Sequence, residues 1–296
     1  MSETAQFRAK AEAEAARLPP LLARAEHLAG TVLLGEHGRR RPGMGDDFWQ
    51  YRPVQPGDEL RQIDWRRSGR SDTQYLRQTE WQIAQSVTIW VDGAASMRFS
   101  SDPGNPDIPE KAERARVLAL ALAILLNRAG ERVGLAGTDL PPRRGEPQIE
   151  RLAQGLSSDD AADYGKPDTN GMLAHGRALF VSDFLGSIEG VRDALTTAAD
   201  RGVQGIVYQV LDPEEEMFSS FRGRTIFKSM GDTLTHETLK ASDLKVRYLE
   251  RLDQRKYELE ELCRRTGWLF GRHTTSNSAQ EALQWLYHAF DGEYRG

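Results

Sequence analysis

The feature that most constrains the fold is a repeated alternation of short apolar runs with longer segments of helical spacing. Five runs have the length and the branched or aromatic content of buried strands: residues 87–91, 132–136, 178–181, 206–211 and 268–273. Helices are predicted between and after them, at residues 110–129, 188–200, 242–265 and 279–290. Strands that alternate with helices form a parallel sheet, so we predict an α/β fold with an open, mostly parallel sheet and helices on both faces.

The region before the first of these strands has a different character. Its opening helical segment is interrupted at Pro19 and Pro20, and a glycine- and arginine-rich loop follows at residues 35–45. Residues 75–82 have strand-like content, and residues 222–230 are a further candidate for extended structure. We therefore expect an N-terminal helical and loop segment at residues 1–82 and an α/β domain at residues 83–296.

Composition and charge exclude several classes of protein. The net charge of −5 argues against nucleic acid as the main partner, because phosphate binding needs an excess of Lys and Arg. Cys263 is the only cysteine, so neither an internal disulfide nor a cysteine-rich metal site can form. The longest strongly apolar run, residues 117–126, is too short to cross a bilayer, and the N-terminus lacks the apolar core of a secretory signal. We expect a cytoplasmic protein without membrane insertion.

Aspartates follow the predicted strands. Asp92, Asp183 and Asp212 come directly after strands, and Asp139 lies just beyond another. In an open parallel sheet, ligands bind beyond the carboxyl ends of the strands, at the point where the strand order reverses. Aspartate is also a favoured helix N-cap. We interpret Asp139 and Asp212 as helix caps, and Asp92 and Asp183 as candidates for a binding site.

The segment that begins at Asp92, Asp-Gly-Ala-Ala-Ser-Met, resembles the metal-ion-dependent adhesion motif of von Willebrand factor A domains. That motif has serines two and four positions after its aspartate, and its partners are a threonine in a later loop and an aspartate at the end of a later strand. Thr169 and Asp183 occur in this order. The resemblance implies a von Willebrand factor A-like, Rossmann-like fold and a metal site made of Asp92, Ser96, Thr169 and Asp183.

Oxygen ligands of this kind suit Mg²⁺, which takes six oxygens in near-octahedral geometry and keeps several waters. One position would stay open for a carboxylate from a partner protein. The sequence departs from the family motif at Ala94, where the family has its first serine. A methyl group cannot ligate, so a water fills that place or the metal binds weakly. Alternatively, Ser96 and Thr169 hydrogen-bond the backbone of their own loops, and the site holds no metal.

A second resemblance lies before the sheet. The stretch from Gly57 to Trp65, Gly-Asp-Glu-Leu-Arg-Gln-Ile-Asp-Trp, is similar to the signature of the bacterial domain-of-unknown-function family fifty-eight. Residues upstream of it match the same family: Gly43, Gly45, Phe48 and Arg52. The resemblance implies that a von Willebrand factor A-like domain follows, and that the protein works with a MoxR-type AAA ATPase.

Within this signature, Asp58, Arg61 and Asp64 can form a local charge network, because an arginine can donate two hydrogen bonds to one carboxylate. Ile63 and Trp65 alternate with charged positions, so both are expected to point into the core. We interpret the segment, Asp58, Arg61, Asp64 and Trp65 included, as a structural clasp that ties the N-terminal region to the sheet. The alternative is a docking surface for a partner.

These observations lead to three hypotheses about function. The first is a non-catalytic protein-interaction module that accompanies a MoxR-type ATPase and carries a degenerate metal-ion-dependent adhesion site. The second is a metal-dependent hydrolase centred on Asp92 and Asp183, although no histidine or lysine base lies in those motifs. The third is a structural scaffold with no functional metal site. We favour the first hypothesis, in which the chain is not an enzyme.

Overall fold

The structure is a computed structural model of the 296-residue chain. It describes residues 21–32, 42–43, 47–54, 63–69, 74–80, 85–218, 225–228, 235–238 and 241–291. The chain divides into two compact units, residues 35–84 and residues 1–34 together with 85–296. The boundary expected near residue 82 is close to the observed one, but the helix at residues 21–30 belongs to the larger unit and not to a separate N-terminal segment.

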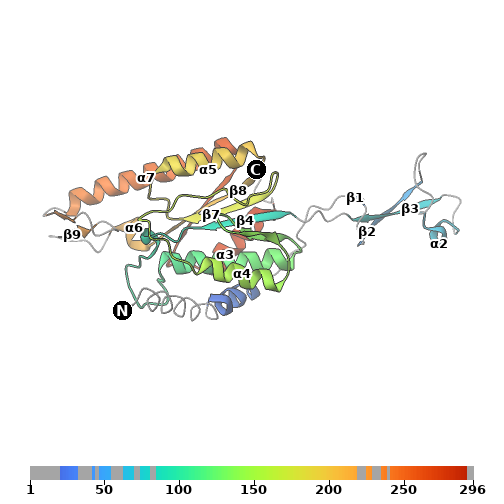
Figure 1. The fold of residues 1–296 in the computed structure, drawn as a ribbon, viewed down its shortest axis with the longest axis horizontal. Helices are drawn as coiled ribbons and strands as arrows, with labels where there is room; N and C mark the ends of the chain where they lie inside the picture. The colour runs from blue at the N-terminus through green and yellow to red at the C-terminus, as the bar shows by residue number, and fades with distance from the viewer. Residues whose placement is uncertain are drawn as a thin grey trace. The chain divides into compact units, whose positions relative to one another are not determined.

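The larger unit is built on a six-stranded sheet with the order β11-β8-β7-β4-β5-β6 (Figure 1). Its strands are β4 (Ser86–Val91), β5 (Arg132–Leu135), β6 (Leu140–Arg143), β7 (Arg177–Ser182), β8 (Gln204–Leu211) and β11 (Leu269–Thr274). All neighbours pair in parallel except β5 and β6, which form an antiparallel hairpin. The predicted α/β fold is confirmed. Strand β6 was not predicted, because Pro141 and Pro142 weaken its strand signal and suit only an edge position.

Helices cover both faces of this sheet (Figure 1). One face carries α3 (Lys111–Arg128), α4 (Glu146–Leu156) and α8 (Ala279–Asp291), and the other carries α5 (Ile188–Asp200) and α7 (Ala241–Thr266). Two short helices, η2 (Ala95–Met97) and α6 (Pro213–Met217), follow β4 and β8. The predicted helices agree with α3, α5, α7 and α8 to within a residue or two, whereas α4 was not predicted.

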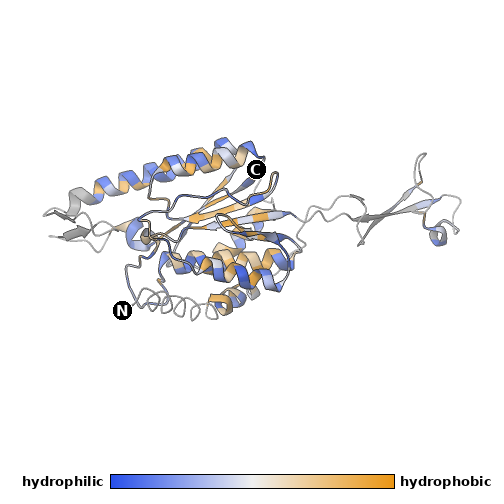
Figure 2. Cartoon of the chain, viewed as in Figure 1, coloured by the Kyte–Doolittle hydropathy of each residue, from blue (hydrophilic) through white to orange (hydrophobic). Residues whose placement is uncertain are grey.

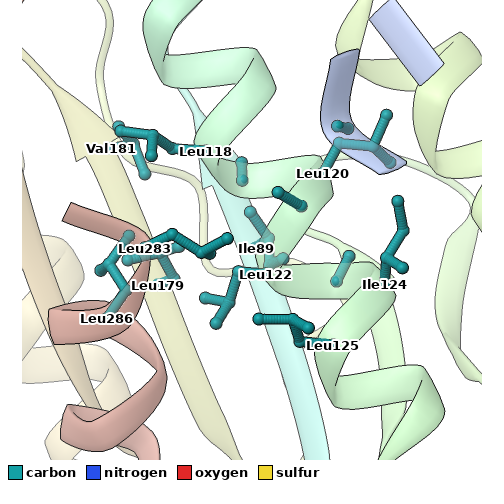
Figure 3. Close-up of a cluster of buried hydrophobic side chains, with 14 of the residues drawn as sticks. Ile89, Leu118, Leu120, Leu122, Ile124, Leu125, Leu179, Val181, Leu283 and Leu286 are labelled. Atoms are coloured by element: carbon teal, nitrogen blue, oxygen red, sulfur yellow. The ribbon is translucent and has the colours of Figure 1, made fainter. Parts of the chain in front are cut away.

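Helix α3 forms the centre of the main core (Figure 3). It is apolar almost all round, as expected for a helix enclosed between a sheet and other helices (Figure 2). Its leucines pack against side chains of β4, β7 and α8, among them Ile89, Leu179, Val181, Leu283 and Leu286. Burial of each such side chain contributes about 2 kcal/mol to the free energy of unfolding, so this core supports the sheet edge described below.

The N-terminal helix at residues 21–30 packs on the same core. Leu21, Ala25, Leu28 and Ala29 are all buried and recur at the spacing of one helix face. The opposite face of the sheet has its own core, in which the Phe180 and Trp268 rings lie 4.9 Å apart. Cys263 is buried in this second core.

The smaller unit contains a three-stranded antiparallel sheet with the order β1-β3-β2, made of β1 (Pro42–Gly43), β2 (Asp47–Pro53) and β3 (Tyr75–Glu80). Helix α2 (Trp65–Ser68) precedes β3. Ile63 is buried as predicted, but Trp65 is 59% exposed, so the expectation that it points into the core is wrong. The alternation of a strand does not continue past Asp64, because Trp65 begins a helix.

Asp64 ties this unit together locally. Its carboxylate accepts a hydrogen bond from the Tyr51 hydroxyl at 3.0 Å, and its carbonyl accepts one from the Ser68 hydroxyl at 2.7 Å. Its backbone N–H donates to the carbonyl of Tyr75 at 2.9 Å. These contacts make Asp64 a structural residue within the unit. Asp58, Arg61 and the basic run of residues 39–41 lie outside the described residues.

The remaining described strands, β9 (Thr225–Lys228) and β10 (Thr235–Thr238), form an antiparallel hairpin between α6 and α7 in the sequence. The extended structure expected at residues 222–230 is therefore confirmed for β9. Across the described residues, no helix combines the length and the apolar character that crossing a bilayer requires.

Candidate functional site at the carboxyl edge of the sheet

The strand order of the sheet reverses between β4 and β7. The chain leaves β4 for β5 on one side and returns to β7 on the other, which makes this edge the topological switch point of the fold. Asp92 follows β4 directly and Asp183 follows β7 directly. The backbone N–H of Asp92 donates to the carbonyl of Val181 at 2.9 Å. The structure therefore brings the two predicted aspartates to the same edge.

The carboxylate of Asp92 is buried and hydrogen-bonded through both oxygens. Its Oδ1 accepts from the N–H of Ala94 at 2.8 Å, and its Oδ2 accepts from the Ser182 hydroxyl at 2.7 Å and from the N–H of Gly165 at 3.2 Å. Burial raises the pKa of Asp92, the hydrogen bonds from Ser182 and Ala94 oppose that rise, and the charge of Asp183 adds to it.

Gly165 lies directly against this carboxylate. A Cβ atom at this position would lie 2.2 Å from Oδ1 of Asp92, so the position excludes any larger residue. The backbone of the loop before Thr169 therefore packs directly against the carboxylate of Asp92.

A cationic side chain already lies at Asp183. Nζ of Lys111, the first residue of α3, is 2.8 Å from Oδ2 of Asp183 and 2.6 Å from Oε1 of Glu215. The Lys111 side chain is fully buried, and its Nζ lies 5.8 Å from the centre of the Phe99 ring. Burial disfavours the charge on Lys111, but Asp183 and Glu215 together outweigh it, and the pKa of Lys111 is raised. Lys111 is therefore an ammonium throughout the physiological pH range.

Glu215 is positioned by the start of helix α6. Asp212 is the N-cap of this helix and forms a capping box in which Oε2 of Glu215 accepts from the N–H of Asp212 at 2.9 Å. Oδ2 of Asp212 also accepts from the N–H of Ser101 at 2.9 Å. The prediction that Asp212 caps a helix is confirmed. The same prediction is wrong for Asp139, which lies exposed in the turn of the β5–β6 hairpin because a strand follows it.

Ser96 and Met97 lie in η2, immediately beyond Asp92. Ser96 is buried, and among the described residues its hydroxyl has no hydrogen-bond partner. The sulfur of Met97 accepts a hydrogen bond from the N–H of Asp183 at 3.2 Å. Asp92, Ser96 and Asp183 therefore come from two loops that touch each other, as the sequence predicted.

The loop at residues 158–165 is fastened to the loop after β4 by backbone hydrogen bonds. Ala95 and Ser96 each donate an N–H to this loop at 2.9 Å, and Asp160 donates its N–H to the carbonyl of Gly93 at 2.9 Å. Arg116 of α3 adds an ion pair with Asp159 at 2.6 Å. This loop presents Tyr164 to solvent, with 46% of the residue exposed.

Thr169 lies in a different environment. Its carbonyl accepts from the N–H of Met172 at 3.3 Å and from Nη1 of Arg201 at 3.4 Å. It lines a cavity of about 340 Å³ together with residues of α5, among them Asp193 and Thr197. In the described part of the chain, no hydrogen bond joins Thr169 to Asp92 or Asp183. The structure thus places Asp92, Ser96 and Asp183 on two loops in contact with each other, and Thr169 on a further loop beside α5.

The arrangement does not fit a resident divalent ion. Mg²⁺ needs several oxygens directed at one point, and here Lys111 and the N–H of Leu185 each donate to Asp183, while three donors converge on Asp92. Within the described residues, no group of three or more His, Cys, Asp or Glu side chains is placed to hold a metal ion.

The loop that carries Asp183 is held in an unusual conformation. Phe184 has a φ of 52°, in the left-handed region that residues with a Cβ rarely adopt. Arg255 of α7 donates to the carbonyls of Phe184 and Gly186 at 2.7 and 2.6 Å. This contact fixes the turn after Asp183. The sequence gives no signal for this role of Arg255, because its partners are backbone carbonyls.

Comparison with known families matches residues 50–248 to "Protein of unknown function DUF58". The chain is 29% identical over 202 residues to the uncharacterized protein Rv1480 of Mycobacterium tuberculosis (strain ATCC 25618 / H37Rv). It is equally similar to the uncharacterized protein Mb1516 of Mycobacterium bovis, at 29% identity over 202 residues. The match covers 62% of this chain and spans 61% of the length of each relative.

Among solved structures, the chain is similar to the conserved hypothetical protein BatB from Bacteroides thetaiotaomicron, with 17% identity and a TM-score of 0.39. That alignment covers 70% of this chain and 98% of the other. An aerotolerance-related membrane protein from Bacteroides fragilis NCTC 9343 aligns with 19% identity and a TM-score of 0.38, over 69% and 98% of the two chains. At this level of likeness, the two structures carry no argument about function.

Proposed function

Because the chain belongs to the DUF58 family, whose function is unknown, we propose from its own geometry that it is a non-catalytic protein-interaction module. One observation carries this proposal, the closed cluster of Lys111, Asp183 and Glu215 at the switch point. An acid–base or nucleophilic centre must direct a proton or a lone pair at its substrate. In this cluster the ammonium protons and the carboxylate lone pairs are directed at one another, which favours a structural platform over a reactive centre.

We place the docking surface on the loop at residues 158–165, which covers this platform. Two exposed carboxylates, Asp160 and Asp163, lie in the same loop as the exposed Tyr164, whereas Asp159 is ion-paired with Arg116. Tyrosine is enriched among the residues that contribute most to protein interfaces. Because backbone hydrogen bonds already hold the loop, little conformational entropy is lost when a partner binds. A complementary partner would offer basic side chains around a pocket for the tyrosine ring.

The family resemblance supplies a candidate for that partner, a MoxR-type AAA ATPase in the cytoplasm, and a von Willebrand factor A-like identity for the α/β unit. Both remain part of the proposal. Magnesium binding at Asp92, Ser96, Thr169 and Asp183 also remains a prediction, which the experiment in the next subsection decides. In our proposal the platform needs no metal, because Lys111 supplies its positive charge.

The test of this function is site-specific crosslinking in the native cell. A photoreactive amino acid at Tyr164 is expected to capture the ATPase, whereas the same probe at Tyr257, which is 69% exposed on α7, captures far less. With purified proteins, Tyr164→Ala should raise the dissociation constant about tenfold or more. Equal capture at both positions, or no capture of an ATPase at Tyr164, would contradict the proposal.

A metal-dependent hydrolase remains the second candidate. The observation in its favour is the pair of buried carboxylates, Asp92 and Asp183, at the edge where α/β enzymes bind their ligands. Turnover that requires added Mg²⁺ or Mn²⁺ and is lost in Asp92→Ala would support this reading against our proposal.

A further inference from the structure

We propose that the ammonium of Lys111 is the resident cation of the switch point and takes the place of a divalent metal ion. The inference does not rest on the proposed function. It rests on the position of Nζ, which lies between carboxylate oxygens of Asp183 and Glu215. Asp183 directly follows β7, and Glu215 lies in the first turn of α6.

Burial of Lys111 is not explained by the stability of its own helix. The N-terminus of a helix carries a partial positive charge, so a cation at the first position of α3 is unfavourable there. A long flexible side chain also normally keeps its charged end in water. Here the side chain is fully buried. The attraction that offsets both costs comes from the carboxylates of Asp183 and Glu215.

Charge balance points the same way. Asp183 and Glu215 contribute two carboxylates to one ammonium, and the charge of Asp183 also acts on the nearby Asp92. Without a cation, the edge would bury negative charges side by side, at a cost that proteins avoid by pairing or by metal binding. Because the ammonium is part of the chain itself, this charge compensation does not depend on the metal concentration in the cell.

Removal of this ammonium should change which cations the site can bind. Replacement of Lys111 by a short polar residue leaves a cavity at the carboxylates of Asp183 and Glu215, next to the loop that carries the unpartnered hydroxyl of Ser96. Carboxylate and hydroxyl oxygens together with water are the ligands that Mg²⁺ and Mn²⁺ prefer. Lys111→Ser should therefore acquire a divalent-cation site that the native chain does not have.

The experiment measures thermal unfolding and calorimetric binding of Mg²⁺ and Mn²⁺ by the full chain. For the native chain and for the matched control Lys166→Ser, whose side chain is 68% exposed, we expect no saturable heat and no shift in Tm. For Lys111→Ser, millimolar Mn²⁺ should raise Tm by about 3 °C or more, because an ion that binds only the folded state stabilises it. Asp183→Asn in the Lys111→Ser background should abolish that rise.

Two results would overturn the inference. One is saturable binding of either ion by the native chain that Asp183→Asn removes, since the divalent ion would then be the native occupant. The other is a folded Lys111→Ser chain that Mn²⁺ does not stabilise. Should this variant not fold in a chelator, refolding from urea is compared with and without millimolar Mn²⁺. Recovery only with Mn²⁺ supports the inference, and recovery in neither condition contradicts it.

Discussion

Nζ of Lys111 lies 2.8 Å from Oδ2 of Asp183, and both side chains are almost completely withdrawn from solvent. The two residues are far apart in the sequence: Lys111 begins α3, and Asp183 directly follows β7. The pair therefore links the N-terminus of the central core helix to the switch point of the sheet. Removal of one partner would leave an uncompensated charge in the interior, which is far costlier than breaking an exposed ion pair.

The first prediction concerns the size of this contribution. Lys111→Met keeps the length of the side chain but removes its charge, and should lower the free energy of unfolding by about 3–5 kcal/mol in urea titrations. The control Lys166→Met breaks a 3.8 Å surface contact with Asp193. It should change the free energy of unfolding by less than about 0.5 kcal/mol. Similar losses in the two variants would show that the buried pair has no special role.

The second prediction follows from Asp92. Because burial raises its pKa above the ordinary 3.8, the folded chain binds a proton there more readily than the unfolded chain. Between these two pKa values the free energy of unfolding falls as pH rises. Relative to Asp92→Asn, the native chain should therefore lose stability in urea titrations as the pH rises above about 4. Asp139→Asn, in the exposed hairpin turn, controls for the loss of one carboxylate. A constant difference between the native chain and Asp92→Asn would contradict the account.

The third prediction has the opposite sign. Burial, with a smaller contribution from the charge of Arg114, lowers the pKa of His273 to about 3, so the imidazole is neutral in the folded chain at neutral pH. In the unfolded chain the imidazole accepts a proton near its ordinary pKa of 6.5. The contribution of the neutral His273 to the free energy of unfolding is therefore complete above that pH and is lost progressively on acidification. His273→Phe, which keeps a ring beside Tyr208, should remove this acid sensitivity.

The measurement for His273 is the free energy of unfolding in urea between about pH 6.5 and pH 4. The native chain should lose stability faster than His273→Phe, whereas His288→Gln, on the exposed side of α8, should follow the native chain. Parallel curves for the native chain and His273→Phe would show that the pKa of His273 is the same in the folded and unfolded chain, which contradicts the prediction.

The fourth prediction concerns Cys263. Burial raises the pKa of this thiol to about 12, and only the thiolate reacts with disulfide reagents. At neutral pH the folded chain should react no faster than it unfolds, whereas denaturant should release one reactive thiol per chain. Complete labelling within seconds in the absence of denaturant would show that α7 does not pack as described.

Much of the larger unit could be predicted because its signals are local. The apolar runs of β4, β7 and β8 and the lengths of α3, α5 and α7 follow from periodicity alone. The meeting of Asp92 and Asp183 also followed from the sequence, because parallel neighbours end at one edge and each strand ends in an aspartate. The edge strand β6 was missed because its two prolines resemble a loop.

The cation at the site could not be predicted, for a different reason. Lys111 begins an apolar helix, and a lysine at that position is normally solvated. Its two partners, Asp183 and Glu215, are brought to it only by tertiary packing, and no local pattern records that contact. Thr169 was assigned to the site by the order of motifs. Its loop is instead held by the N–H of Gly137, which donates to the carbonyl of Asn170, and by Arg201, which donates to the carbonyl of Thr169, and sequence spacing does not determine these contacts.

The most direct test is a crystal structure of the native chain grown with millimolar Mn²⁺, with anomalous diffraction recorded near the manganese edge. The account predicts density for Nζ of Lys111 between Asp183 and Glu215 and no anomalous peak at that edge of the sheet. An anomalous peak within ligand distance of Asp92, Ser96 and Asp183, with the Lys111 side chain displaced, would contradict it.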